Sequence, residues 1–220
     1  MSTRKRDTTF DQLRMSVQKL LLQQRWEDIS IQQIASDSQV SIGTFYNYYA
    51  SKEEALIDVK EVLSRILVND VKSLCRTFEA PYQKVALMIK YFFSILENHP
   101  DWAKYLFVGN AFSDRLDQGL ESLLKPVIEA GIEQGQFHCQ DIKTIICFIE
   151  NGVFSLIKAH YEQELTYAEA SKISTELTLT LLGLDVSLKR QATQLQCPLT
   201  PIVSLPISIL SRLDLEESYA

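Results

Sequence analysis

The segment VSIGTFYNYYASKEEAL, residues 40–56, decides the fold because its first ten residues contain four aromatic side chains and no long apolar run surrounds them. If residues 41–48 form a helix, each residue advances about 100° around the helix axis. Phe45 and Tyr49 then share the inner side and can anchor the helix to its neighbours. The opposite side would carry the small or hydrogen-bonding residues Gly43, Thr44 and Asn47, with Tyr46 at its edge. Tyr46 and Tyr48 could present their hydroxyls outward.

Serines at helix-start positions predict two short helices, beginning near Ser30 and Ser41, and a long helix that begins at Ser51. Ser30 lies three residues before a glutamine, which is the spacing of a capping box. Ser41 can cap a second short helix. Ser51 and Glu54 form another capping box, which opens a long helix that we expect to reach about Arg76.

Two short helices joined by the tight connection at Ser38–Val40 predict a helix-turn-helix. In such a unit the second helix enters the major groove of DNA, while nearby hydroxyls, amides and lysines hold phosphates. Asn47 can read a base edge, and Ile42 can contact a thymine methyl group. Spacing alone also permits a plain alternative, because many helical proteins contain two short helices and several tyrosines.

At these residues the sequence resembles the TetR/AcrR family of bacterial transcriptional regulators. The resemblance is carried by Ile34-Ala35, by the run from Val40 to Tyr49, and by Ser51-Lys-Glu-Glu-Ala-Leu56, and it covers about residues 8–58. Two positions depart from the family pattern. Gln39 stands where a glycine is usual, which costs on the order of 1 kcal/mol in a left-handed turn. Tyr49 replaces the usual phenylalanine, so its hydroxyl needs a partner.

The resemblance implies a set of DNA contacts at matching positions. Bases or sugars would be contacted from the second short helix and phosphates from the residues around it. The basic run Arg4-Lys5-Arg6 could be an arm that reaches a neighbouring groove, or a solvated, disordered tail. The predicted DNA-binding residues are Ser30, Gln32, Ser41, Ile42, Gly43, Thr44, Tyr46, Asn47, Tyr48 and Lys52.

Helical periodicity extends over nearly the whole chain and predicts an all-α fold of about nine helices. We expect an N-terminal three-helix DNA-binding domain with a helix-turn-helix at residues 1–56, its motif at about 30–52. A larger helical ligand-binding and dimerisation domain would follow at 57–189, and a proline-punctuated tail at 190–220. Outside the motif, the predicted helices cover about Thr9–Gln24, 81–97, 101–112, 114–134, 141–163 and 167–189, with Gly135 as a left-handed C-terminal cap.

The charges are distributed unevenly. The net charge is -6, but residues 1–52 carry seven Lys/Arg against five Asp/Glu, a balance of +2, and the remainder is -8. This contrast permits a small basic face on an acidic body. The sequence shows no secretory signal, and its best apolar stretch, 144–157, is short and interrupted by Glu150 and Asn151. We therefore predict a cytoplasmic protein with no membrane partner and reduced cysteines.

The resemblance also implies a homodimer through a four-helix bundle made by residues 141–163 and 167–189 of each copy. Small residues on the first helix would permit close approach, and they are Gly152, Ser155 and Ala159. The second helix offers residues at matching steps, namely Ala170, Ser174, Leu177, Thr178 and Leu181. Packing within one subunit would use the same residues, so the sequence leaves both interpretations open.

A small-molecule pocket is the second family property that the resemblance implies. Effector binding would shift the long helix that begins at Ser51 and release DNA, provided that the effector binds the released shape more tightly. Aromatic residues at helical spacing also build ordinary cores. The candidate ligand-binding residues are Phe92, Trp102, Tyr105, Phe112, Glu150, Asn151 and Phe154.

The helix-turn-helix pattern predicts a DNA-binding protein, and the resemblance implies a transcriptional regulator, a repressor that binds a palindromic operator as a homodimer and is released by a small-molecule effector. No catalytic motif is present, and the three histidines lack metal-ligand spacing, so we predict neither an enzyme nor a metal site nor a cofactor. The alternative is a dimeric helical adaptor or binding protein without DNA-binding activity. The tail would pack on the body or be disordered, or it would dock a partner.

Overall fold

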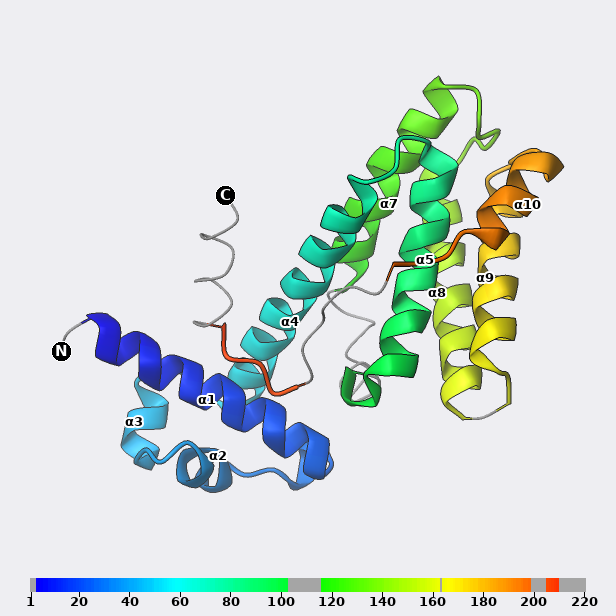
Figure 1. The fold of residues 1–220 in the computed structure, drawn as a ribbon. Helices are drawn as coiled ribbons and strands as arrows, with labels where there is room; N and C mark the ends of the chain where they lie inside the picture. The colour runs from blue at the N-terminus through cyan, green and yellow to red at the C-terminus, as the bar shows by residue number, and fades with distance from the viewer. Residues whose placement is uncertain (1–2, 103–115, 163, 199–204, 210–220) are drawn as a thin grey trace. The chain divides into compact units, whose positions relative to one another are not determined.

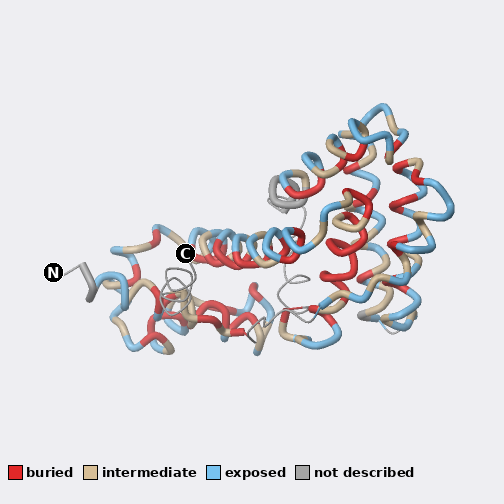
Figure 2. The backbone as a smooth tube through the Cα atoms, turned by 45° about the horizontal axis from the view of Figure 1, so that its top comes forward, coloured by how far each residue is buried: buried red, intermediate tan, exposed pale blue. Residues whose placement is uncertain are grey.

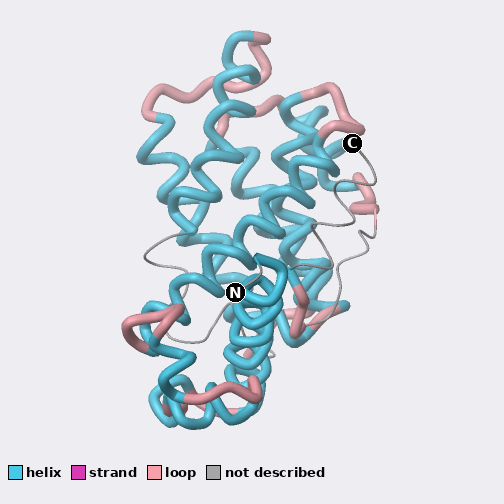
Figure 3. The backbone as a smooth tube through the Cα atoms, turned by 90° about the vertical axis from the view of Figure 1, so that its left-hand side faces the viewer, coloured by secondary structure: helices cyan, strands magenta, loops and turns pink. Residues whose placement is uncertain are grey.

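The structure, a computed structural model, describes residues 3–102, 116–162, 164–198 and 205–209 (Figure 1). Every regular element in these ranges is a helix (Figure 3), which confirms the all-α prediction. The described chain forms two compact units. The first contains residues up to Arg65 together with 205–209, and the second contains Ile66 onward up to 198. This division lies inside a helix and later than the predicted boundary at 56, and it assigns the predicted tail partly to each unit.

The first unit is built around α1 (Thr3–Gln23), which packs on α2 (Ile31–Asp37). A 3-10 helix, η1 (Trp26–Asp28), joins them, and α3 (Ile42–Tyr46) follows. Leu13 and Val17 of α1 are fully buried in this core. Because α1 begins at Thr3, six residues earlier than predicted, the backbone of the basic run at residues 4–6 is helical and not a disordered tail.

The second unit is arranged around α5 (Pro81–Asn98), which has the most buried residues of the described helices (Figure 2). Helix α5 packs against α7 (Leu116–Glu133), α9 (Tyr167–Leu181) and α10 (Val186–Gln194). Helix α8 (Ile142–Tyr161) packs against α7 and α9. A long helix, α4 (Lys52–Cys75), begins in the first unit and ends in the second.

Two glycines with positive φ set helix boundaries. Gly135 has φ 68° and follows α7, as predicted. Gly183 has φ 71°, and a Cβ there would lie 2.8 Å from the His138 carbonyl oxygen. The single helix predicted over 167–189 is therefore wrong. The chain breaks at Gly183, and Asp185 starts α10 by accepting a hydrogen bond from the Ser187 amide at 2.7 Å.

Part of the predicted helix 101–112, with Tyr105 and Phe112, lies outside the described residues. Among the described helices, none combines the length and the apolarity needed to cross a bilayer.

Candidate nucleic-acid interface

Two capped helices and a strained turn form the predicted helix-turn-helix. The Gln33 amide donates to Ser30 Oγ at 3.3 Å, and the Ser30 amide donates to Gln33 Oε1 at 2.8 Å, which completes the capping box. Ser41 Oγ accepts from the Thr44 amide at 3.0 Å and starts α3. Gln39 has φ 57°, so the predicted left-handed turn is formed by a non-glycine residue. Helix α3 ends at Tyr46, two residues earlier than predicted.

Three of the four aromatic side chains divide between an inner and an outer side as the helical projection predicts. Phe45 is 0% and Tyr49 3% exposed, and their ring centroids lie 5.6 Å apart. Tyr46, in contrast, is 53% exposed. We call the outer side the α3 face; its exposed members are Ser41, Ile42, Gly43, Tyr46 and Asn47.

Gly43 is not required by the packing of its own chain. A Cβ built on Gly43 would find only Ser41 Oγ nearby, at 3.8 Å, which is ordinary van der Waals contact. Its φ is not in the left-handed region, so alanine fits the backbone. Glycine is a poorer helix former than alanine by up to about 1 kcal/mol. The absent side chain therefore leaves room for something outside this chain.

A network of side chains holds the end of α3 to α1 and α4. The Tyr49 hydroxyl, which sequence reasoning left in need of a partner, donates to Asp58 Oδ2 at 2.7 Å. Arg14 donates two bonds to the same carboxylate, at 2.7 and 2.6 Å. Burial, then the hydrogen bond to Asp58, raises the pKa of Tyr49 far above its ordinary value. The end of α3 is thus held by hydrogen bonds that reach both α1 and α4.

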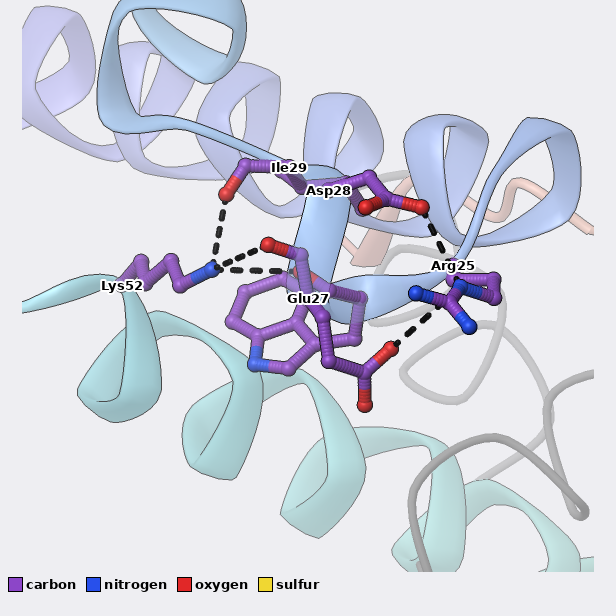
Figure 4. Close-up of polar contacts among 6 residues, drawn as sticks. Arg25, Glu27, Asp28, Ile29 and Lys52 are labelled. Carbon is purple, nitrogen blue, oxygen red and sulfur yellow. Dashed lines mark hydrogen bonds and ion pairs between the residues drawn. The ribbon is translucent and has the colours of Figure 1, made fainter.

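The Lys52 ammonium binds backbone carbonyl groups of its own chain (Figure 4). Its Nζ donates to the carbonyl oxygens of Ile29 at 2.8 Å, Trp26 at 3.2 Å and Glu27 at 3.5 Å. The same ammonium lies 5.1 Å from the centre of the Trp26 ring, in cation-π contact. An ammonium has three hydrogens, and the carbonyls at the end of η1 occupy their directions. The predicted phosphate contact is not what this geometry favours, because Lys52 instead fixes the connection before α2.

Tyr48 also turns back onto its own unit rather than outward. Its hydroxyl donates to the Arg6 carbonyl oxygen at 3.2 Å, and its ring stacks on Phe10 with centroids 5.5 Å apart. This bond brings the backbone at the basic start of α1 to the end of α3. Sequence reasoning missed this placement, because it treated residues 4–6 as separate from the motif.

The other basic side chains early in this unit pair with acidic ones. Arg14 binds Asp58, Lys19 binds Asp37, and Arg25 lies 3.2 Å from Asp28. Arg6 is exposed. Among the described side chains of residues 6–52, therefore, Arg6 is the cation best placed to reach a polyanion beside α3.

Two helices of the second unit expose a different kind of surface, the α8–α9 face, defined as Phe148, Gly152, Ser155, Leu177 and Leu181. Phe148 is 67%, Leu177 56% and Leu181 47% exposed. A Cβ on Gly152 would find nothing within 4 Å, so here too the chain's own packing does not need a glycine. The prediction placed four further residues in this interface, but Ala170, Ser174 and Thr178 are buried within the subunit and Ala159 is half-buried.

A cavity of about 20 Å³ lies between α5, α7 and α8. Three candidate ligand-binding residues line it, namely Phe92, Glu150 and Phe154. Trp102 is fully buried but does not line the cavity. Asn151 is exposed and donates to the Cys147 carbonyl at 2.8 Å, so its assignment to the pocket is wrong. The remaining lining residues are Met88, Ile89, Leu124, Ile149, Val153 and Ile157.

Solved structures share this architecture. RolR in complex with resorcinol superposes with a TM-score of 0.69 at 18% identity, covering 89% of this chain and 98% of RolR. A TetR-family regulator from Syntrophomonas wolfei gives a TM-score of 0.67 at 16% identity, over 80% of this chain and 95% of that chain. The chain has the TetR-family fold. The transcriptional regulator FadR from Bacillus subtilis, in complex with stearoyl-CoA, gives a TM-score of 0.64 at 18% identity over 78% of this chain and 96% of FadR. No family model and no curated protein matches the chain.

Proposed function

We propose that the protein is a cytoplasmic transcriptional regulator that binds duplex DNA through the α3 face. The observation that carries this proposal is Gly43, a helical glycine on an exposed face with room for a side chain that the protein does not use. A helix that enters the major groove must approach base edges and backbone closely, and a missing side chain serves that approach. The TetR-family fold supports the same assignment.

The contacts divide by chemistry. Ile42, Gly43, Thr44 and Asn47 would meet bases and sugars, because they lie on or beside the outer side of α3. Phosphates would be held by Ser30, Gln32, Ser41 and Tyr46, whose polar groups lie around it, and by the basic start of α1. Tyr48 and Lys52 would position these groups rather than touch DNA.

A homodimer through the α8–α9 face would complete the DNA-binding form. Few cations per subunit give weak binding at physiological salt, because affinity scales with the number of phosphates neutralised. A two-fold symmetric dimer doubles the contacts and requires a palindromic operator with half-sites about one helical turn apart. The large exposed hydrophobic residues Phe148, Leu177 and Leu181 supply the apolar area that such an interface buries.

The protein would act as a repressor that a small molecule releases from DNA. That small molecule would bind in the cavity between α5, α7 and α8. About 20 Å³ holds roughly one water molecule, so an effector has to separate these helices to enter. A ligand that binds only the widened state shifts the protein toward it. The surface that lines the cavity is apolar, which favours an apolar effector.

Selection of bound duplexes from a randomised library tests the proposal. The full-length protein should enrich an inverted repeat, and Asn47→Ala should change the preferred base at one position of each half-site while retaining non-specific affinity. Failure of the folded protein to enrich any sequence would contradict DNA recognition. That result would favour a dimeric helical adaptor, the role to which the internally bonded Lys52 and the net charge of -6 point.

A further inference from the structure

A segment near the C-terminus is docked on the first helix of the chain. Residues 205–209 belong to the same compact unit as α1, although their hydrogen bonds to it join residues 189 to 198 positions apart. Leu205 is 6% and Ile207 3% exposed, so both side chains are buried.

Gln18 of α1 forms two hydrogen bonds with the backbone of one residue of this segment, Ile207. Its Nε2 donates to the Ile207 carbonyl oxygen at 3.1 Å, and its Oε1 accepts from the Ile207 amide at 2.8 Å. A primary amide offers one donor edge and one acceptor edge, so it pairs with a peptide group as a neighbouring strand would. Gln18 is only 2% exposed, and a buried amide without partners is costly. Helix α1 therefore carries a site suited to an extended main chain.

Asp11 supplies the second half of this site. Its Oδ2 accepts from the Ser208 hydroxyl at 2.6 Å, and its Oδ1 accepts from the Ile209 amide at 2.7 Å. Asp11 is 8% exposed and lies seven residues before Gln18, hence on the same side of the helix two turns away. Two buried polar side chains on one side of α1 thus form four hydrogen bonds with a short peptide, one donated and three accepted.

A different side of α1 supports the helix-turn-helix. Ser16, 2% exposed, donates to the Ile34 carbonyl oxygen of α2 at 3.1 Å, and Leu13 and Val17 fill the core. Helix α1 is therefore fixed by the docked segment on one side and carries α2 on another. Loss of the segment would expose Gln18 and Asp11 and remove the apolar cover of Leu205 and Ile207.

We propose that residues 205–209 are an intramolecular ligand of α1, whose docking holds the helix-turn-helix in its DNA-binding form. This inference rests on the proposed function. The chain before the docked segment is itself anchored, since Lys90 of α5 donates to the carbonyls of Thr193 and Leu195 at 2.6 Å each. Because the segment belongs to the same chain as α1, its docking is intramolecular and is favoured over binding of a separate peptide.

Truncation after Pro198, followed by addition of a synthetic peptide of residues 199–215, tests the proposal. In the truncated protein, amide hydrogen exchange in α1 should be roughly tenfold faster, and affinity for the selected palindrome roughly tenfold lower. The peptide added in trans should restore both. Unchanged α1 exchange and unchanged DNA affinity in the truncated protein would overturn the inference.

A point variant covers the case in which the truncated chain does not fold. Gln18→Leu keeps the side-chain volume but leaves the Ile207 amide and carbonyl unpaired, so α1 exchange should accelerate and DNA affinity should fall. Gln23→Leu, an exposed glutamine on the same helix, is the matched control and should change neither. Wild-type exchange and DNA affinity in Gln18→Leu would refute the docking role.

The two proposals fail in different ways. If the peptide restores slow exchange in α1 but neither protein binds any duplex, the proposed function is wrong and the docking stands. If the full-length protein binds its palindrome and truncation changes nothing, the docking role is wrong and the function stands.

Discussion

The α3 face and the α8–α9 face are both exposed, and each contains a helical glycine with room for a side chain, yet they suit different partners. The α3 face offers hydroxyls, an amide and one isoleucine, whereas the α8–α9 face offers a phenylalanine and two leucines. The α3 helix has five residues, and α8 has twenty. A helix of five residues has no stability of its own. The α3 face is therefore held by the buried Phe45 and by the contacts of Tyr49 with Asp58, while the α8–α9 face is part of long helices.

The largest expected effect is the loss of the dimer when a charged residue is introduced on the α8–α9 face. Phe148→Asp would bury a carboxylate against its symmetry mate, which costs several kcal/mol. Light scattering should give about the 25.2 kDa chain mass instead of roughly twice that value. DNA affinity should fall on the order of 100-fold, because one half-site is lost. Ile57→Asp, at an exposed residue of α4 outside both faces, should stay dimeric. A wild-type mass for Phe148→Asp would show that the dimer forms elsewhere.

Lys52→Met should destabilise the first unit by about 2 kcal/mol, because three carbonyls lose a charged donor. DNA affinity should fall through this loss, while the slope of log affinity against log salt stays the same. Thermal unfolding and a salt titration measure the two effects. The control is Lys72→Met at an exposed lysine of the same helix. A salt slope reduced by about one, with unchanged stability, would instead place Lys52 on a phosphate.

Tyr49→Phe should cost about 1 kcal/mol at pH 8, because the bond to Asp58 is lost. Burial and Asp58 raise the pKa of Tyr49 above its ordinary value of 10. The stabilisation by its hydroxyl is therefore fully present below pH 10 and declines as the pH rises above 10, where the unfolded state ionises. The stability difference between wild type and variant, measured by denaturant unfolding, should shrink from pH 8 to pH 11. A constant difference would contradict this assignment.

The smallest effects compare the two glycines directly. Gly43→Ala and Gly152→Ala should each leave stability unchanged or raise it by up to about 1 kcal/mol, because alanine favours helix and neither site is crowded. Gly43→Ala should weaken DNA binding without changing the mass, and Gly152→Ala should weaken the dimer without affecting non-specific binding by each subunit. Thermal unfolding, light scattering and DNA titration of both variants separate these outcomes. If both variants keep the DNA affinity and the dimer mass of the wild type, neither glycine is needed for close approach of a partner.

Local signals made the helix-turn-helix predictable from sequence. The serine caps, the inward placement of Phe45 and Tyr49 and the turn at Gln39 all depend on a few neighbouring residues, and the structure has each of them. The outward placement predicted for the Tyr48 hydroxyl is wrong, because its partner is the distant Arg6. Helical periodicity similarly located α5, α7 and α8 to within a few residues.

What could not be predicted depends on groups distant in sequence. The break at Gly183 reflects the nearby His138 carbonyl, and the docked segment reflects Gln18, 189 positions before Ile207. Lys52 belongs to a motif that implies a phosphate contact, but its carbonyl partners appear only in three dimensions. Exposure of Phe148 had a partial signal, because it lies one turn before Gly152 on the same side of α8.

The hydrogen bond between Tyr48 and Arg6 affects the spacing of the contacts that one subunit would make on an operator. Because one hydroxyl fastens the beginning of α1 to the end of α3, both would move over the duplex as a single block. The width of the footprint within one half-site is then fixed by the subunit itself. Tolerance to insertions in the operator would arise only between half-sites, where the two copies meet.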